Sequence, residues 1–272
     1  MKRPLLLALV VLLALPAACE PQTRAPPAEL ARVSEGVQYA SVDRLGPHVF
    51  LSSIVRTTVN AKGTARSSEE AVEIKWVDWN TFAYRRVVDG EAVMSVTTVE
   101  GRPYVLRPDG GATLREDAEP YRIELRAGWD TWDQALSRFS AVTELTDQGS
   151  EVIEGRPARR FSVSLKPPPA EESPQQAQRR AIIEREQGAA RALSGTVWID
   201  EATAVKLVAD VSGEWATGPQ LEKVTLKLAR SAFGQPIDLR APANAAAAPL
   251  LPTEVPPDPA ASRSKRPAPR EP

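Results

Sequence analysis

Residues 205–228 read VKLVADVSGEWATGPQLEKVTLKL, and this stretch predicts how the chain folds. Apolar residues occupy every second position in both of its halves: Val205, Leu207, Ala209 and Val211, and then Val224, Leu226 and Leu228. Successive side chains of a β-strand point to opposite faces of the sheet. Each half therefore has one apolar and one mostly polar face, which is typical of an antiparallel sheet that buries a single face.

The same two-residue period recurs upstream, in residues 72–76 (VEIKW) and at Phe161, Val163 and Leu165. Turn-forming dipeptides separate such runs: Asp89-Gly90, Glu100-Gly101, Asp109-Gly110, Glu154-Gly155 and Ser212-Gly213. Their spacing predicts roughly nine or ten short strands joined as hairpins. The predicted fold class is mainly β with helices: a curved antiparallel sheet forming an open half-barrel, with a helix packed in its concavity.

That helix is predicted at residues 129–141, where apolar residues recur at three- and four-residue steps: Trp129, Trp132, Leu136 and Phe139. Such spacing places them on one face of a helix. Thr131 and Gln134 fit a capping box near its start. A second helical segment begins at Ser173-Pro174 and predicts an exposed insertion, about residues 170–194, between two strands.

The aromatic residues raise the question of a ligand cavity. A helix laid across a curved sheet encloses an apolar pocket wherever side chains do not fill the centre. The candidate lining residues are Trp76, Trp129, Trp132, Leu136, Phe139 and Trp198. The alternative is that they complete a packed core. Trp79 is expected to point away from Trp76, because the two are three residues apart in one predicted strand.

The N-terminal residues MKRPLLLALVVLLALPAAC predict export from the cytoplasm. Two basic residues, an apolar run and small residues make a signal peptide over residues 1–18. Cys19 follows directly, as in a bacterial lipobox, although Pro16 stands where such a motif usually has Leu. We expect lipidation of Cys19, since an unpaired Cys in an exported protein needs an explanation; ordinary cleavage that leaves a free thiol is the alternative.

The remaining segments follow from composition. Residues 19–33 are expected to be a lipid-anchored tether, 34–240 the folded domain, and 241–272 a disordered Pro- and Ala-rich tail. Glu20 after the cysteine resembles outer-membrane sorting. The expected location is therefore the periplasmic face of a bacterial envelope membrane, more specifically the outer membrane.

Several classes of function are disfavoured. Lys and Arg total 34 against 35 Asp and Glu, which is too balanced for a nucleic-acid binder. One Cys and one His leave no internal disulfide and no His-rich metal site, and no nucleotide-binding loop is present. His48 has no accompanying nucleophile motif, and carboxylate pairs such as Glu69-Glu70 are expected in turns or polar segments, where their charge is solvated. We expect no enzyme activity, no metal and no cofactor.

Two short strings carry a family resemblance: GRPARRF at residues 155–161 and GTVWID at residues 195–200. With the leader, the hairpins and the mid-chain helix, they resemble the LolA/LppX-type lipoprotein carrier superfamily over roughly residues 35–240. The resemblance implies an open half-barrel whose apolar concavity holds acyl chains. The anchor, the helical insertion and the tail depart from that family pattern, so no functional residue is carried over.

Two functions are consistent with these features. The first is a membrane-anchored periplasmic lipoprotein that binds a hydrophobic, acyl-chain ligand in lipid or lipoprotein transport. The second is a structural or signalling envelope lipoprotein that binds a protein partner and has no ligand cavity. An empty apolar space between sheet and helix would favour the first, and an exposed apolar patch over a filled core would favour the second.

Overall fold

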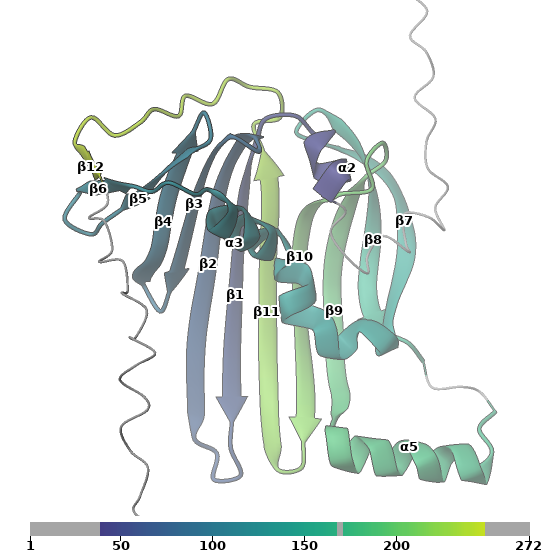
Figure 1. Cartoon of the computed structure of the whole chain (residues 1–272). Coiled ribbons are helices and arrows are strands. Elements are labelled where there is room, and N and C mark those ends of the chain that lie inside the picture. The colour runs from purple at the N-terminus through teal and green to yellow at the C-terminus, as the bar shows by residue number, and fades with distance from the viewer. Residues whose placement is uncertain (1–38, 168–170, 248–272) are drawn as a thin grey trace, which may run out of the picture.

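The computed structural model describes residues 39–167 and 171–247, and their main feature is one curved, open antiparallel sheet (Figure 1). Its strand order is β12-β6-β5-β4-β3-β2-β1-β11-β10-β9-β8-β7. Hairpin neighbours lie side by side, and β1 pairs with β11 to join the two halves of the chain. The predicted half-barrel class is confirmed.

The strands on the first side of the sheet are β1 (His48–Val59), β2 (Ala65–Asp78), β3 (Thr81–Val88), β4 (Glu91–Val99), β5 (Arg102–Leu106) and β6 (Ala112–Leu114). Those on the second side are β7 (Thr143–Ile153), β8 (Arg156–Leu165), β9 (Ala189–Asp200), β10 (Lys206–Thr217) and β11 (Gln220–Ser231). A short β12 (Ala245–Ala247) runs parallel to β6.

The alternation in the sequence determines the two faces of this sheet. On β1, Phe50 and Ile54 are buried whereas Leu51 between them is 48% exposed. The buried face, here called the inner face, continues through Ile74 on β2 and Leu226 on β11. The outer face carries the alternating partners, such as Lys227.

Short helical segments cover the inner face. They are α3 (Glu119–Trp129), α4 (Thr131–Leu136) and the 3-10 helix η2 (Ser137–Val142), and α3 and α4 cross in front of the sheet in Figure 1. A small helix, α2 (Tyr39–Asp43), precedes β1, and α5 (Pro174–Gln187) lies below β9. No helix in the described part of the chain is both long and apolar enough to cross a membrane.

The helix expected at residues 129–141 is instead three shorter pieces. The break falls at Asp130, whose N–H bonds to Arg126 and Ala127 carbonyl oxygens. The capping box expected at Thr131 is absent, because Asp130 is the residue before α4 and Gln134 Nε2 donates to the Ala127 oxygen. By contrast, Ser173 does cap α5 in a full capping box with Gln176.

Four of the five expected turns lie between strands, and one does not. Gly213 lies inside β10 at a place where a Cβ would be 2.7 Å from the Phe139 ring, so the glycine there serves packing and not a turn. Glu69-Glu70 lies in the polar first half of β2, where Glu69 is exposed and Glu70 is partly exposed.

The domain limits also differ from expectation. Residues 189–194 belong to β9, so the helical insertion ends at Gln187. Residues 245–247, expected in the disordered tail, pair with β6 because that strand otherwise has a free side at the sheet edge. The signal peptide, Cys19, the 19–33 tether and most of the tail lie outside the described residues.

Candidate functional site

The inner face beneath α3 and α4 holds a cluster of aromatic side chains. The rings of Trp76 and Trp129 meet edge to face with centroids 4.9 Å apart, and Phe82 stacks on Trp76 at 6.5 Å. Trp79 joins the cluster, at 4.9 Å from Trp76 and 5.7 Å from Trp129. Edge-to-face contacts of this kind add stability beyond the area they bury.

Trp79 therefore lies on the same side as Trp76, contrary to expectation. The strand register slips between Trp76 and Asp78, and β2 ends before Trp79. A slip of one residue moves all later side chains to the other face. The Trp79 indole N–H donates to Asp43, which ties the cluster to α2.

The structure brings together five of the six candidate cavity residues. The side chains of Trp76, Trp129, Trp132, Leu136 and Phe139 are each 5% exposed or less and belong to one core cluster. Trp198 lies on the outer face, where its N–H donates to Glu151 and the Arg160 guanidinium covers its ring. The sequence could have indicated this position, because Trp198 alternates along the strand with Val197 and Ile199, which are buried on the inner face.

The helices lie close against the sheet. A Cβ on Gly128 of α3 would be 2.7 Å from the Tyr84 ring, a contact that native side chains do not make. The Phe139 ring similarly lies over Gly213 and meets Trp215 edge to face at 5.5 Å. Tyr84 and Trp215 thus contact the helices from the sheet. Neither was among the candidate residues taken from the sequence.

Polar contacts also attach this helical layer to the sheet and its turns: Arg122 of α3 donates to the Trp79 carbonyl at 3.0 Å and to Asn80 at 2.9 Å, and Lys166 donates to the Ala141 carbonyl at 3.1 Å. Arg56 donates to the Gln134 carbonyl at 2.7 Å, and Arg138 pairs with Glu222 at 2.7 Å. Three buried hydroxyls, on Ser52, Thr98 and Thr131, have no hydrogen-bond partner among the described residues. Buried hydroxyls without partners cost free energy.

A buried polar group closes one end of the inner face. The Arg230 guanidinium donates to Nε2 of His48 at 2.8 Å and to the Lys206 carbonyl at 3.1 Å, and it lies 4.4 Å from the Phe50 ring. Since Nε2 accepts, the His48 proton is on Nδ1 and is donated to the Gly46 oxygen at 2.8 Å. Burial, reinforced by the Arg230 charge, lowers the pKa of His48 to about 3.

Two cations lie in the same region. Burial lowers the pKa of Arg230 to about 9, so it stays charged at pH 7. Burial also lowers the pKa of Lys206 to about 8, against the opposing effect of Asp133. The Lys206 ammonium lies 5.2 Å from the centre of the Trp132 ring, at the border of the aromatic cluster.

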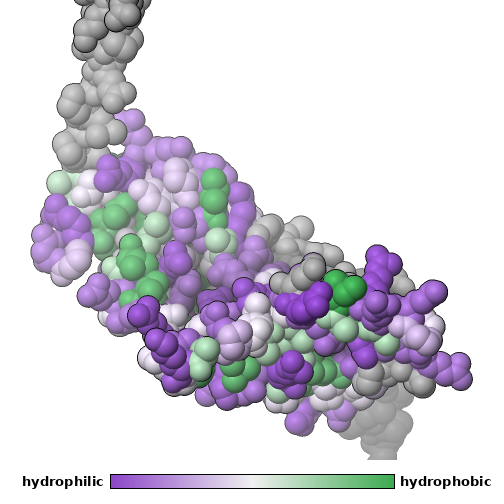
Figure 2. Space-filling model, turned by 90° about the horizontal axis from the view of Figure 1, so that it is seen from below, coloured by the Kyte–Doolittle hydropathy of each residue, from purple (hydrophilic) through white to green (hydrophobic). Residues whose placement is uncertain are grey.

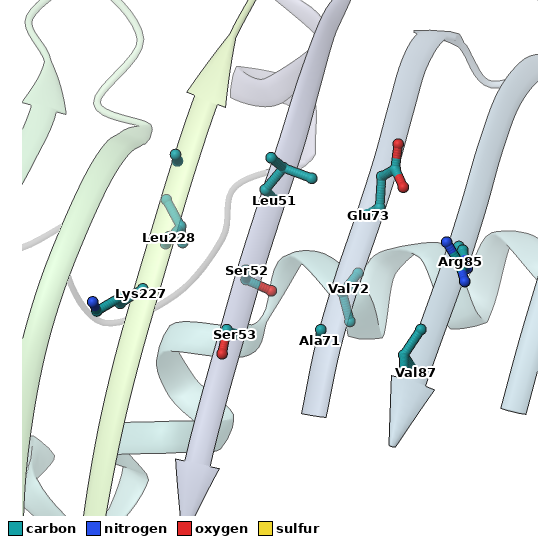
Figure 3. A pocket seen from close by; sticks show the side chains of 11 residues that line it. Leu51, Ser52, Ser53, Ala71, Val72, Glu73, Arg85, Val87, Lys227 and Leu228 are labelled. Carbon is teal, nitrogen blue, oxygen red and sulfur yellow. The ribbon is translucent and has the colours of Figure 1, made fainter. Parts of the chain in front are cut away.

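Two hollows on the described part of the surface lie away from this cluster. One, of about 390 Å³, lies on the outer face and is lined by residues such as Leu51, Ala71, Glu73 and Lys227 (Figure 3). The other, of about 600 Å³, lies beside β4 and α3. Seen from below, the apolar patches on the surface are small and separate (Figure 2).

Within residues 39–167 and 171–247, no group of three or more His, Cys, Asp or Glu side chains could hold a metal ion. His48, whose two ring nitrogens are both hydrogen-bonded inside the fold, is positioned as a structural residue.

No protein-family model matches the chain, and no curated protein matches it. Solved structures do show likenesses. The Mycobacterium tuberculosis lipoprotein LppX has 17% identity over 79% of this chain and 100% of its own, with a TM-score of 0.28. The proteins found thus include a member of the group that the sequence resembles.

Two further structures are similar at the same level. A LolA-superfamily protein from Nitrosomonas europaea has 7% identity over 75% of this chain and 93% of its own, with a TM-score of 0.22. The Pseudomonas aeruginosa MucA/MucB complex has 18% identity over 79% of this chain, with a TM-score of 0.27, and the chain spans 62% of the matched one. Similarity this low carries no inference about ligand or partner.

Proposed function

We propose that this protein is a non-enzymatic binding protein of the bacterial cell envelope, anchored through Cys19, whose inner face receives an acyl chain when α3 and α4 move off the sheet. The observation that carries the proposal is a broad apolar face covered by short helices. In place of a second sheet, residues 119–142 form the cover in three segments.

The cover has the properties of a part that can move. Neither α3 nor α4 has a side-chain cap at its start, and the helical conformation is interrupted between them at Asp130. Uncapped helix ends are less stable than capped ones. Its apolar side chains could exchange contacts with the sheet for contacts with an acyl chain at little net cost, because both are hydrophobic burial.

In the closed state Phe139 and Trp132 are already buried in a packed core, which is the arrangement expected of the partner-binding protein, so the acyl-chain proposal rests on opening of the cover. An acyl chain can therefore bind only after the cover opens. Opening costs free energy, so only a fraction of the molecules is open, and the apparent affinity is lower than the intrinsic affinity by that fraction. A protein in which the cover never opens is a scaffold that binds a protein partner through its surface, which is the competing function.

The test is titration with 11-(dansylamino)undecanoic acid, a fatty acid that fluoresces in apolar surroundings. We expect saturable binding to the wild type, and at least a fivefold change in Kd for Trp132→Ala. Trp198→Ala is the matched control, since it removes the same side chain from the outer face. No saturable binding by the wild type would leave the partner-binding scaffold as the function.

Chemical denaturation of the same variants separates folding from binding. Because Trp132 is 5% exposed, its truncation should cost about 3–5 kcal/mol of unfolding free energy. Trp132→Phe keeps part of the contact and is the variant to titrate if the alanine variant does not fold.

A further inference from the structure

Two cationic side chains are buried at one end of the inner face. Lys206 on β10 is 6% exposed, and Arg230 on β11 is 2% exposed. The Arg230 guanidinium donates to the Lys206 carbonyl at 3.1 Å, and its positive charge also acts on the Lys206 ammonium. Two buried like charges are unfavourable unless anions offset them, because neither keeps its full hydration.

The anions that act on Lys206 belong to the cover. Burial lowers the pKa of Lys206, and Asp133 of α4 counteracts this, followed by Asp130 between α3 and α4. In return, burial raises the pKa of Asp133 and Lys206 lowers it. Asp200, a buried carboxylate of the neighbouring β9, pairs with Arg156 at 2.7 Å. The charge of Lys206 is thus offset in part by a segment that leaves the sheet when the cover opens.

Trp132 shows where Lys206 lies relative to the apolar part of the inner face. The Lys206 ammonium is 5.2 Å from the centre of the Trp132 ring. Trp132 belongs to the core cluster, and it directly precedes Asp133 in α4. The ammonium therefore lies where the apolar cluster ends and a carboxylate of the cover begins. A fatty acid has the same sequence of groups, since its apolar chain ends in a carboxylate.

We propose that the ligand of the inner face is an acyl chain that ends in a carboxylate, and that this carboxylate binds Lys206 in place of Asp133 when the cover opens. The inference rests on the proposed acyl binding and names the class of ligand. Opening moves Asp133 and Asp130 away together with α4. A carboxylate on the ligand replaces their negative charge and accepts charge-assisted hydrogen bonds from the ammonium, which a neutral head group cannot do.

The two cations have different roles in this site. Arg230 is fixed within the sheet, because it donates to His48 on β1 and to the Lys206 carbonyl on β10. It contributes positive potential to this end of the inner face. Lys206 has a flexible stem, and its ammonium reaches the cover. We therefore assign the direct contact with the ligand carboxylate to Lys206.

The test compares 11-(dansylamino)undecanoic acid with its methyl ester, which has the same chain and fluorophore but no carboxylate. Both are titrated at pH 7 into the full chain carrying Cys19→Ser, so that no anchor lipid competes. We expect the acid to bind the wild-type site at least tenfold more tightly than the ester. Equal Kd values would overturn this inference and leave acyl binding intact, whereas saturable binding of neither probe would overturn both.

Variants of Lys206 assign the preference to this residue. The readout is the ratio of the two Kd values, because a change in the open fraction alters both Kd values equally and cancels in the ratio. Lys206→Met has a similar volume without the charge and should bring the ratio to within twofold of one. Lys206→Arg keeps the charge and should retain a preference of at least fivefold. An unchanged ratio in Lys206→Met would overturn the assignment.

Asp133→Asn tests whether the ligand carboxylate takes the place of Asp133. The variant lacks the attraction that holds α4 to Lys206, so the cover should open more readily. We expect both probes to bind at least threefold more tightly, with the ratio of their Kd values within twofold of the wild-type ratio. Unchanged Kd values for both probes would show that Asp133 does not occupy the site in the closed state, and would overturn the exchange.

Discussion

At the scale of single residues, His48 and Arg230 show how burial determines protonation. Both side chains are at most 2% exposed, and the imidazole accepts a hydrogen bond from the guanidinium. A charged imidazole there would face a second cation and lose solvation, so His48 stays neutral. The pair ties the start of β1 to the end of β11, and Arg230 also reaches the first residue of β10.

The first prediction is acid sensitivity. The pKa of His48 is about 3 in the folded chain against 6.5 in the unfolded chain, so between these values only the unfolded state takes up the proton. Stability should therefore fall as pH falls, by about 1.4 kcal/mol per pH unit below 6.5, or about 2 kcal/mol by pH 5. Urea denaturation at both pH values measures this.

His48→Gln provides the comparison, because glutamine can still accept from Arg230 and does not titrate. The variant should lose less stability between pH 6.5 and pH 5 than the wild type. Equal pH slopes in the two proteins would show that His48 is not the titrating group.

At the scale of elements, the cover of the inner face depends on small residues as much as on large ones. α3 lies close to β2 and β3 because Gly128 leaves room for Tyr84. The stripe of Trp129, Trp132, Leu136 and Phe139 was expected on one helix, yet it is buried from three successive segments. The apolar period thus determined which residues are buried, but not where the helix breaks.

The second prediction concerns Gly128→Ala. In an exposed helix this change stabilises by up to about 1 kcal/mol. Here the new Cβ would lie 2.7 Å from the Tyr84 ring and 3.2 Å from Val72, so we expect a loss of about 1–3 kcal/mol in unfolding free energy. The double variant Gly128→Ala, Tyr84→Val should lose less than the sum of the single changes. Strict additivity would argue against the clash.

At the scale of the whole molecule, the two ends of the sheet differ. β7 ends one side with exposed charged residues, which discourage further pairing. On the other side β12 adds to β6, and the lower part of β4 is left open. The chain thus closes part of its own edge with residues that composition alone assigned to a disordered tail.

The third prediction uses two truncations. Removing residues 248–272 should leave the thermal midpoint nearly unchanged, because few bulky apolar residues are lost, and a shift of more than a few degrees would show that the tail docks. Truncation after Arg240 also removes β12, in which Ala245 and Ala246 are not fully buried, and should add only a few degrees. Scanning calorimetry of both proteins separates the two contributions; a combined loss above about 10 °C would show that the tail belongs to the core.

The fourth prediction concerns the anchor. Cys19→Ser should abolish acylation and release the protein from the membrane fraction. The wild-type anchor is stable because it consists of several acyl chains, and the variant lacks them all. Intact mass spectrometry of the mature wild type should show the lipid mass on its N-terminal cysteine. A mature protein without that mass would leave the envelope location to the signal peptide alone.

The sequence by itself determined the features that depend on neighbours along the chain. Alternation gave the strands and their buried faces, Gly-containing dipeptides gave most hairpins, and Ser173 marked the start of α5. It also identified the apolar stripe above the sheet. These features are local because strand and helix periods, turns and caps involve residues only a few positions apart.

Tertiary structure alone decided which distant residues meet. A register slip after Trp76 brought Trp79 into the aromatic cluster, and the Phe139 ring took the space above Gly213. The pairing of His48 with Arg230 joins residues 182 positions apart, and the open edge of β4 exists because β5 is short. Such contacts depend on strand register and on packing across the sheet, which no period along one strand encodes.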